Sequence, residues 1–202
     1  MKSKKILAAV CALMLLTLTA CSSGDAAFVL GGKSFSLGSK LSALPVSYYE
    51  QQKEQTLAPG STNEISSGIS AVPYYKLWIQ NNSEKECTFA QADMTAVLMI
   101  GGKPEDLTVA GITFGQSQGD VSKLIDTYKK EKNAAVSTDT DPEMGGSIES
   151  AMRSVFFKTD GEQWSESIYV LRYNFSNDEV ITVAFRDNVV YALALTAPEK
   201  DR

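Results

Sequence analysis

The chain has 202 residues, of which 44% are hydrophobic, and its 19 Lys and Arg residues against 24 Asp and Glu residues give a net charge of −5. This length suits one domain or two small ones, and the acidic balance excludes nucleic-acid binding because no cationic surface is available to displace counterions. The chain has no histidine, which excludes Ser-His-Asp and Cys-His catalysis and removes the usual general base and the commonest zinc ligand.

The first 20 residues have the pattern of a secretory signal. Three lysines precede an apolar run over residues 6–20, which is shorter than the roughly 20 residues that span a bilayer as a helix. The run ends in Leu18-Thr19-Ala20-Cys21, and this sequence resembles the lipobox of bacterial lipoproteins. The resemblance implies cleavage before Cys21, a diacylglyceryl thioether on its sulfur and acylation of the new amino terminus. The alternative is an ordinary secretory signal that is cut after Ala20.

Removal of residues 1–20 leaves a more acidic chain. The signal contains three of the 19 basic residues and none of the 24 acidic ones, so 16 basic residues remain and the net charge becomes −8. The acyl chains would therefore have to supply the affinity for an anionic membrane. Residues 21–27 are the lipidated cysteine and a short polar tether. With Cys11 lost and Cys21 lipidated, Cys87 has no disulfide partner, and it is expected to be a buried small hydrophobe rather than a reactive thiol.

The N-terminal half, residues 28–105, is predicted to be mostly β. Two apolar stretches flank Gly31-Gly32, which predicts a hairpin over residues 28–37. Pro45 interrupts an apolar stripe, so residues 41–55 are predicted to form a short helix or a turn. The other predicted segments are a loop over 57–71, strands over 72–80, 86–89 and 94–100, and a turn over 81–84.

The C-terminal half, residues 106–202, follows an internal boundary marked by a second Gly-Gly-Lys sequence. Ser117 has Asp120 three residues later, which is typical of a capped helix start. The predicted helix has one apolar face, formed by Val121, Leu124, Ile125 and Tyr128. The other predicted segments are a strand over 107–114, a polar loop over 133–147 and strands over 152–158, 167–175, 179–186 and 189–196. In the last strand, alternation predicts one shared face for Val189, Tyr191, Leu193 and Leu195.

These elements predict the α+β class, with a helix covering one side of an antiparallel sheet in a two-layer arrangement. The sequence also contains a short internal similarity. Residues 35–39 and 112–116 both read apolar, hydroxyl, apolar, glycine, polar. This suggests two related halves.

The start of the predicted helix resembles that of a group of small bacterial lipoproteins. Residues 111–121 match the pattern G-I-x-x-G-x-S-x-x-D-V. The group includes lipoproteins of Gram-positive bacteria and, more distantly, the small lipoprotein subunit of the outer-membrane assembly machine and the β-lactamase-inhibitor-protein fold. The resemblance covers residues 107–196, with a looser match over 28–100, and implies a helix-on-sheet scaffold used for protein contacts, with no catalytic residue. This chain departs from the pattern by a long polar insertion between helix and sheet.

The sequence Asp139-x-Asp141-x-Glu143 is a candidate calcium site, because its alternating carboxylates supply the oxygen ligands that calcium prefers. It lacks the glycine and the distal glutamate of an EF-hand loop, and Pro142 stiffens it. A solvated acidic loop is therefore favoured, and no metal or cofactor is predicted.

Tyr74, Lys76 and Trp78 are the candidate partner-contact residues. They would share one face of a strand, where exposed aromatic side chains can bind a glycan or a protein. The opposite face would belong to the core and carries Tyr75, Leu77 and Ile79. The alternative for the first set is that it, too, is buried.

The sequence therefore predicts a lipid-anchored, extracytoplasmic binding or scaffold protein of the bacterial cell envelope. It would be held at the outer face of the cell membrane by the lipid on Cys21 and would contact another envelope protein, without a catalytic residue. The alternative is a cell-wall hydrolase or an inhibitor of a cell-wall-active enzyme, because a catalytic pair of carboxylates can come from distant sequence positions.

Overall fold

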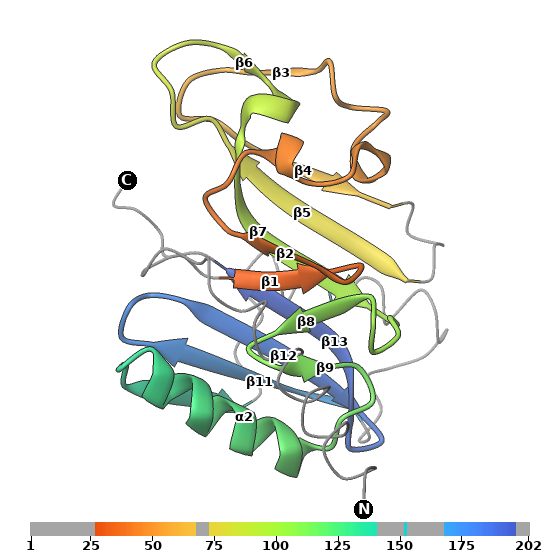
Figure 1. The fold of residues 1–202 in the computed structure, drawn as a ribbon, viewed down its shortest axis with the longest axis vertical. Coiled ribbons are helices and arrows are strands. Elements are labelled where there is room, and N and C mark those ends of the chain that lie inside the picture. Colours follow the sequence, from red (N-terminus) through yellow and green to blue (C-terminus); the bar gives the residue numbers. More distant parts are fainter. Residues whose placement is uncertain (1–26, 68–72, 141–151, 153–167, 197–202) are drawn as a thin grey trace, which may run out of the picture.

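The computed structural model describes residues 27–67, 73–140, 152 and 168–196. Its main element is a seven-stranded antiparallel sheet with the strand order β10-β11-β12-β13-β7-β5-β4 (Figure 1). The strands of this sheet are β4 (Thr62–Ser66), β5 (Tyr74–Gln80), β7 (Asp93–Ile100), β10 (Val136–Thr140), β11 (Ile168–Phe175), β12 (Val180–Arg186) and β13 (Val189–Thr196). Strands from both halves of the chain meet where β7 pairs with β13. The predicted internal boundary is therefore not a break in the sheet.

A smaller antiparallel sheet lies against one face of the large one (Figure 1). Its strands, in spatial order, are β2 (Lys33–Ser36), β1 (Ala27–Leu30), β8 (Leu107–Val109) and β9 (Ile112–Thr113). The predicted hairpin over residues 28–37 is confirmed, because β1 and β2 pair around Gly31 and Gly32. These two residues have φ angles of 55° and 76°, which glycine adopts without steric cost.

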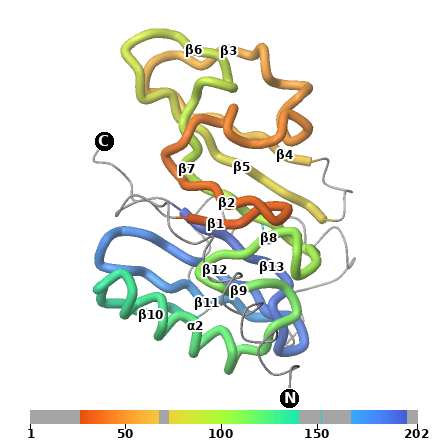
Figure 2. Tube along the Cα trace, viewed as in Figure 1, coloured from red at the N-terminus to blue at the C-terminus, as the bar shows by residue number. Residues whose placement is uncertain are grey.

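The chain between β2 and β7 adds short elements at one end of the molecule, opposite the helix α2 (Gln118–Glu131) (Figure 2). They are the 3-10 helices η1 (Leu41–Ala43), η2 (Val46–Tyr48) and η3 (Phe89–Gln91) and the strands β3 (Thr56–Leu57) and β6 (Cys87–Thr88). The predicted short helix or turn over residues 41–55 is thus confirmed, as are the three predicted strands of this half. The predicted loop over 57–71 is wrong in part, because it contains β4.

The helix α2 spans Gln118–Glu131 and confirms the predicted helix. Ser117 Oγ accepts a hydrogen bond from the backbone N–H of Asp120 at 3.3 Å and donates one to the Asp120 carboxylate at 2.7 Å. The second bond lowers the pKa of the Asp120 carboxyl. Val121, Ile125 and Tyr128 are buried, so the apolar stripe is the face that packs on the sheet.

Replacing Ser117 with alanine is expected to lower the free energy of unfolding by about 1 kcal/mol, because the N–H of Asp120 loses its acceptor at the helix start. Urea denaturation followed by circular dichroism measures the change. Thr127→Ala is the control, since Thr127 lies mid-helix and its hydroxyl donates to the Lys123 carbonyl of the same helix. An equal loss in both variants would contradict the role of Ser117 as a cap.

The packing between the two layers shows why the predicted fold class is wrong. The helix α2 covers only one end of the large sheet, where Tyr128 packs edge-on against Phe175 with ring centroids 5.3 Å apart. The small sheet and the segments of η1 to η3 cover the rest of this face, and Phe28, Leu107 and Leu41 belong to the same core. Among the described residues the protein is therefore largely β, with one α-helix, and is not the helix-on-sheet α+β arrangement of two related halves.

The opposite face of the large sheet carries a second apolar cluster. Its buried members are Tyr74, Trp78, Ala96, Leu98, Ile100, Met152, Val170, Ala184, Ala192 and Ala194. Small alanines make up the part of this face on β12 and β13, with larger side chains at the β5 end. Both faces of the sheet are thus apolar. Alternation along a strand therefore shows which residues share a face, but not which face is exposed to solvent.

The last three predicted strands are confirmed as β11, β12 and β13. The predicted loop over 133–147 is wrong in its first part, because β10 pairs with β11 there. Residues 141–147 and 153–158 lie outside the described residues. Met152, the one described residue of the predicted strand over 152–158, is helical, so the strand prediction is wrong at this position.

A β-bulge changes the predicted face of β13. Ala184 pairs with Ala192 and the next residue, Phe185, pairs with Val190, so Tyr191 is an extra residue on β13. Val190 therefore joins Leu193 and Leu195 in the core between the layers, whereas Tyr191 packs on the second cluster. The predicted grouping of Val189 and Tyr191 with the two leucines is wrong, because one extra residue reverses the alternation.

Candidate functional site

The predicted contact residues Tyr74, Lys76 and Trp78 lie on one face of β5, as alternation indicates. The two rings are nevertheless buried, because Tyr74 is 7% exposed and Trp78 is 9% exposed, and both belong to the second apolar cluster. The predicted exposed aromatic surface is therefore wrong for the rings. The opposite face of the strand contributes to the main core, as expected, with Tyr75, Leu77 and Ile79.

Lys76 and Trp78 meet Glu64, which lies directly opposite Trp78 on the neighbouring strand β4. The Trp78 indole N–H donates a hydrogen bond to Glu64 Oε1 at 2.8 Å, and Lys76 Nζ forms an ion pair with Glu64 Oε2. Lys76 Nζ also lies 5.1 Å from the centre of the Trp78 ring. We call these three residues the β4–β5 cluster. Its carboxylate is fixed by two donors and keeps further acceptor sites for a cation or a hydrogen-bond donor.

The β4–β5 cluster presents more negative than positive charge to solvent. The side chain of Glu64 is 44% exposed, whereas that of Lys76 is only 16% exposed. Glu64 is held in place because the next residue, Ile65, is 1% exposed and anchors β4 in the core. The sequence pattern gives no signal for Glu64, since Ile65 is the only apolar residue in β4 and the segment has the composition of a loop.

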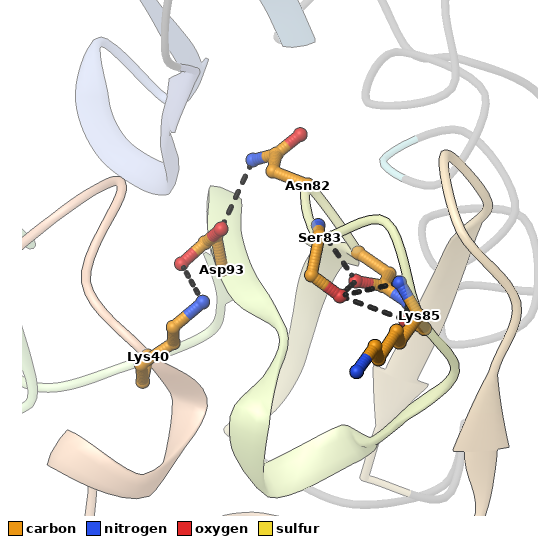
Figure 3. Close-up of polar contacts among 6 residues, drawn as sticks. Lys40, Asn82, Ser83, Lys85 and Asp93 are labelled. Atoms are coloured by element: carbon orange, nitrogen blue, oxygen red, sulfur yellow. Dashed lines mark hydrogen bonds and ion pairs between the residues drawn. The ribbon is translucent and has the colours of Figure 1, made fainter.

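Asp93, at the start of β7, forms a second polar cluster (Figure 3). Its Oδ1 lies 2.8 Å from Lys40 Nζ, and its Oδ2 accepts a hydrogen bond from Asn82 Nδ2 at 3.0 Å. Lys40 and Asp93 are also joined by an isolated β-bridge. Because each carboxylate oxygen has a partner from a different segment, this cluster fastens the chain before η1 and the turn after β5 to the large sheet.

The turn over residues 81–84 is confirmed and is built around the side chain of Asn81, which is 1% exposed. Asn81 Nδ2 donates to the carbonyls of Leu57 and Lys85 at 2.8 and 2.7 Å. Its Oδ1 accepts from the backbone N–H of Ser83 at 2.9 Å. The Ser83 hydroxyl lies 2.7 Å from both this Oδ1 and the Lys85 carbonyl, and its single proton is shared between these two acceptors (Figure 3). All these partners are within the protein, which indicates a structural role.

Glu179, beside β12, is the most buried carboxylate of the described residues, at 1% exposure. The Tyr128 hydroxyl donates a hydrogen bond to its Oε2 at 2.8 Å, and Lys132 Nζ lies 3.6 Å from its Oε1. Burial and this carboxylate raise the pKa of Tyr128 far above its usual range. Tyr128 therefore keeps its proton and remains the donor, and the group ties the end of α2 to the turn between β11 and β12.

Only one of the three candidate calcium ligands lies in the described part of the chain. Asp139 lies on β10, where its Oδ2 accepts a hydrogen bond from Asn174 Nδ2 at 2.8 Å; Asp141 and Glu143 lie outside the described residues. Within the described ranges, no group of three or more acidic or cysteine side chains could hold a metal ion. Cys87 is a free, half-buried thiol that packs against the core.

The predicted signal, Cys21 and the polar part of the tether also lie outside the described residues. In the part of the chain that is described, no helix is both long enough and apolar enough to cross a membrane.

Comparison with known proteins identified no relatives: the chain matches no protein family, no curated protein and no solved structure.

Proposed function

We propose that this protein is a lipid-anchored, extracytoplasmic binding or scaffold domain of the bacterial cell envelope. The observation that carries the proposal is the sequence Leu18-Thr19-Ala20-Cys21 at the end of the apolar run over residues 6–20. Two or three acyl chains would hold the domain firmly, since each buried methylene contributes about 0.8 kcal/mol and one chain alone binds only marginally.

The position of the first strand is consistent with this anchor. Only residues 22–26 separate Cys21 from β1, which begins at Ala27. An extended chain of this length spans at most about 20 Å. The folded domain would therefore stay close to the membrane surface, where it could contact other envelope proteins.

The described polar clusters favour binding over catalysis. The carboxylates of Glu64, Asp93 and Glu179 are each held by donors from neighbouring segments. Such carboxylates can orient a partner or stabilise the fold, and Glu179, at 1% exposure, is closed to a substrate.

The anchor is tested by labelling cells with radioactive palmitate. We expect label in the wild-type protein and none in Cys21→Ser, because the serine cannot form the thioether. Cys87→Ser is the matched control and should be labelled like the wild type. Equal labelling of wild type and Cys21→Ser would refute the lipoprotein assignment.

A further inference from the structure

The outer edge of β4 is one of the two ends of the seven-stranded sheet. The backbone N–H of Asn81 donates to the Ser61 carbonyl, and that of Ser67 donates to the Tyr75 carbonyl. In an antiparallel pair, the residues that bond the neighbouring strand alternate with residues whose backbone groups point away from it. In β4, therefore, Thr62, Glu64 and Ser66 direct their N–H and C=O groups outward. Among the described residues, no strand pairs with this edge.

The strand that bears this edge is fixed and accessible. The side chains of Thr62, Glu64 and Ser66 are exposed, whereas Ile65 is buried opposite Leu77. An edge of this kind can accept an extended segment, which gains main-chain hydrogen bonds from the edge and specificity from side chains on alternate positions. Within the part of the chain that the structure describes, one outward group already has a partner: the N–H of Glu64 donates to Asn63 Oδ1 at 2.7 Å.

The charge at this edge indicates which segment fits. Glu64 is the central outward residue, and its exposed carboxylate is held by Trp78 and Lys76 on the same face of the sheet. Strand pairing would place the Cα atom of the opposite residue about 5.5 Å from that of Glu64, so the two side chains would be neighbours. A lysine or arginine there is attracted, whereas an acidic residue is repelled.

The same charge disfavours a second copy of this chain. Consider the antiparallel register in which all three outward residues of β4 pair with those of a second copy. In this register Glu64 of one copy lies directly opposite Glu64 of the other. Like charges directly opposite each other destabilise a strand pair.

We propose that β4 binds an extended segment of a second extracytoplasmic protein by strand addition, with a lysine or arginine of that segment opposite Glu64. This inference rests on the proposed function as a binding domain and names its contact surface and the kind of partner. The β4–β5 cluster then acts as the specificity element, and the backbone of Thr62, Glu64 and Ser66 supplies the hydrogen bonds.

The test uses the purified mature protein in detergent and a fluorescein-labelled peptide of alternating threonine and valine with a central lysine. Fluorescence anisotropy measures its Kd. We expect saturable binding that weakens at least tenfold when the edge-facing amides of the peptide are N-methylated. It should weaken several-fold when the lysine is replaced by glutamate, and Glu64→Gln should remove this preference.

Ser66→Pro is the edge-blocking variant, because proline is tolerated where an edge N–H faces solvent but removes that donor. It should weaken binding, whereas Ser66→Ala, which keeps the N–H, should not. Failure of the lysine peptide to bind at millimolar concentration, or equal binding to Ser66→Pro and Ser66→Ala, would overturn the proposal. The peptide assay does not depend on the lipid. If Cys21 is labelled with palmitate but the peptide does not bind, strand addition is refuted and the lipid anchor is not.

Discussion

Replacing Tyr128 with phenylalanine is expected to lower the free energy of unfolding by about 1.5–3 kcal/mol, the usual range for a hydrogen bond to a charged group. The Tyr128 hydroxyl is the only hydrogen-bond donor to the Glu179 side chain among the described residues. Glu179 is 1% exposed, so water cannot replace the lost bond. Lys132 Nζ stays 3.6 Å from Glu179 Oε1, which offsets the buried charge only in part. Urea denaturation measures the loss.

A double-mutant cycle separates this interaction from a general effect of losing a hydroxyl. Glu179→Leu removes the buried acceptor, so adding Tyr128→Phe to it should cost much less than Tyr128→Phe alone. Tyr49→Phe, at another buried tyrosine, is the control and should have a small effect. Additive losses in the cycle would show that the two side chains are not coupled.

The same tyrosine gives the stability a dependence on alkaline pH. Because burial and Glu179 raise the pKa of Tyr128, its contribution is fully present below the unfolded-state pKa of about 10 and is lost as pH rises towards the folded-state value. Tyr48, Tyr75 and Tyr173 also have raised pKa values, mainly through burial. Tyr128→Phe should therefore reduce, but not abolish, the loss of stability above pH 10.

Local sequence signals predicted the elements that local chemistry determines. Gly31-Gly32 supplies two left-handed residues for a hairpin, and Ser117 with Asp120 supplies a helix cap. The strong apolar runs became β5, β7 and β11 to β13. In each of these cases the decisive residues are neighbours in the sequence, so no knowledge of the tertiary structure was needed.

The two edge strands were missed for a physical reason. β4 and β10 each contain one apolar residue, Ile65 and Val136. A strand with one paired side and polar side chains buries little apolar surface, so its composition is that of a loop. Its position becomes clear only from the register with β5 or β11, which depends on tertiary structure.

The predicted fold class and the predicted exposure of the Tyr74 and Trp78 rings were wrong because of contacts between residues distant in the sequence. Pairing of β7 with β13 joins residues about a hundred positions apart, as in Val97 with Leu195, and no local pattern predicts it. Trp78 is buried because the second face of the sheet is also apolar, with Ala96 and Leu98 beside it. Sequence alternation correctly placed Lys76 and Trp78 on one face but could not show that Glu64 meets them.

Replacing Gly102 with alanine is expected to destabilise the protein by about 1–3 kcal/mol, the usual cost of overpacking a core. A Cβ atom at this position would lie 2.5 Å from Cε2 of the Phe114 ring. Phe114 is buried in the main core, so its ring cannot move aside without disturbing the packing of its neighbours. The φ angle of Gly102 is not in the left-handed region, and the expected loss is therefore steric rather than conformational.

Two comparisons test that explanation by thermal and urea denaturation. Gly119→Ala, in the first turn of α2, has no atom closer than 3.9 Å to the added Cβ, and it should stabilise the helix by about 0.5 kcal/mol. Phe114→Leu should reduce the cost of Gly102→Ala when the two are combined, because the smaller side chain leaves room for the methyl group. If Gly102→Ala costs as much beside leucine as beside phenylalanine, the close approach of Phe114 is not the reason that glycine is required, and the strain must arise in the backbone that joins β7 to β8.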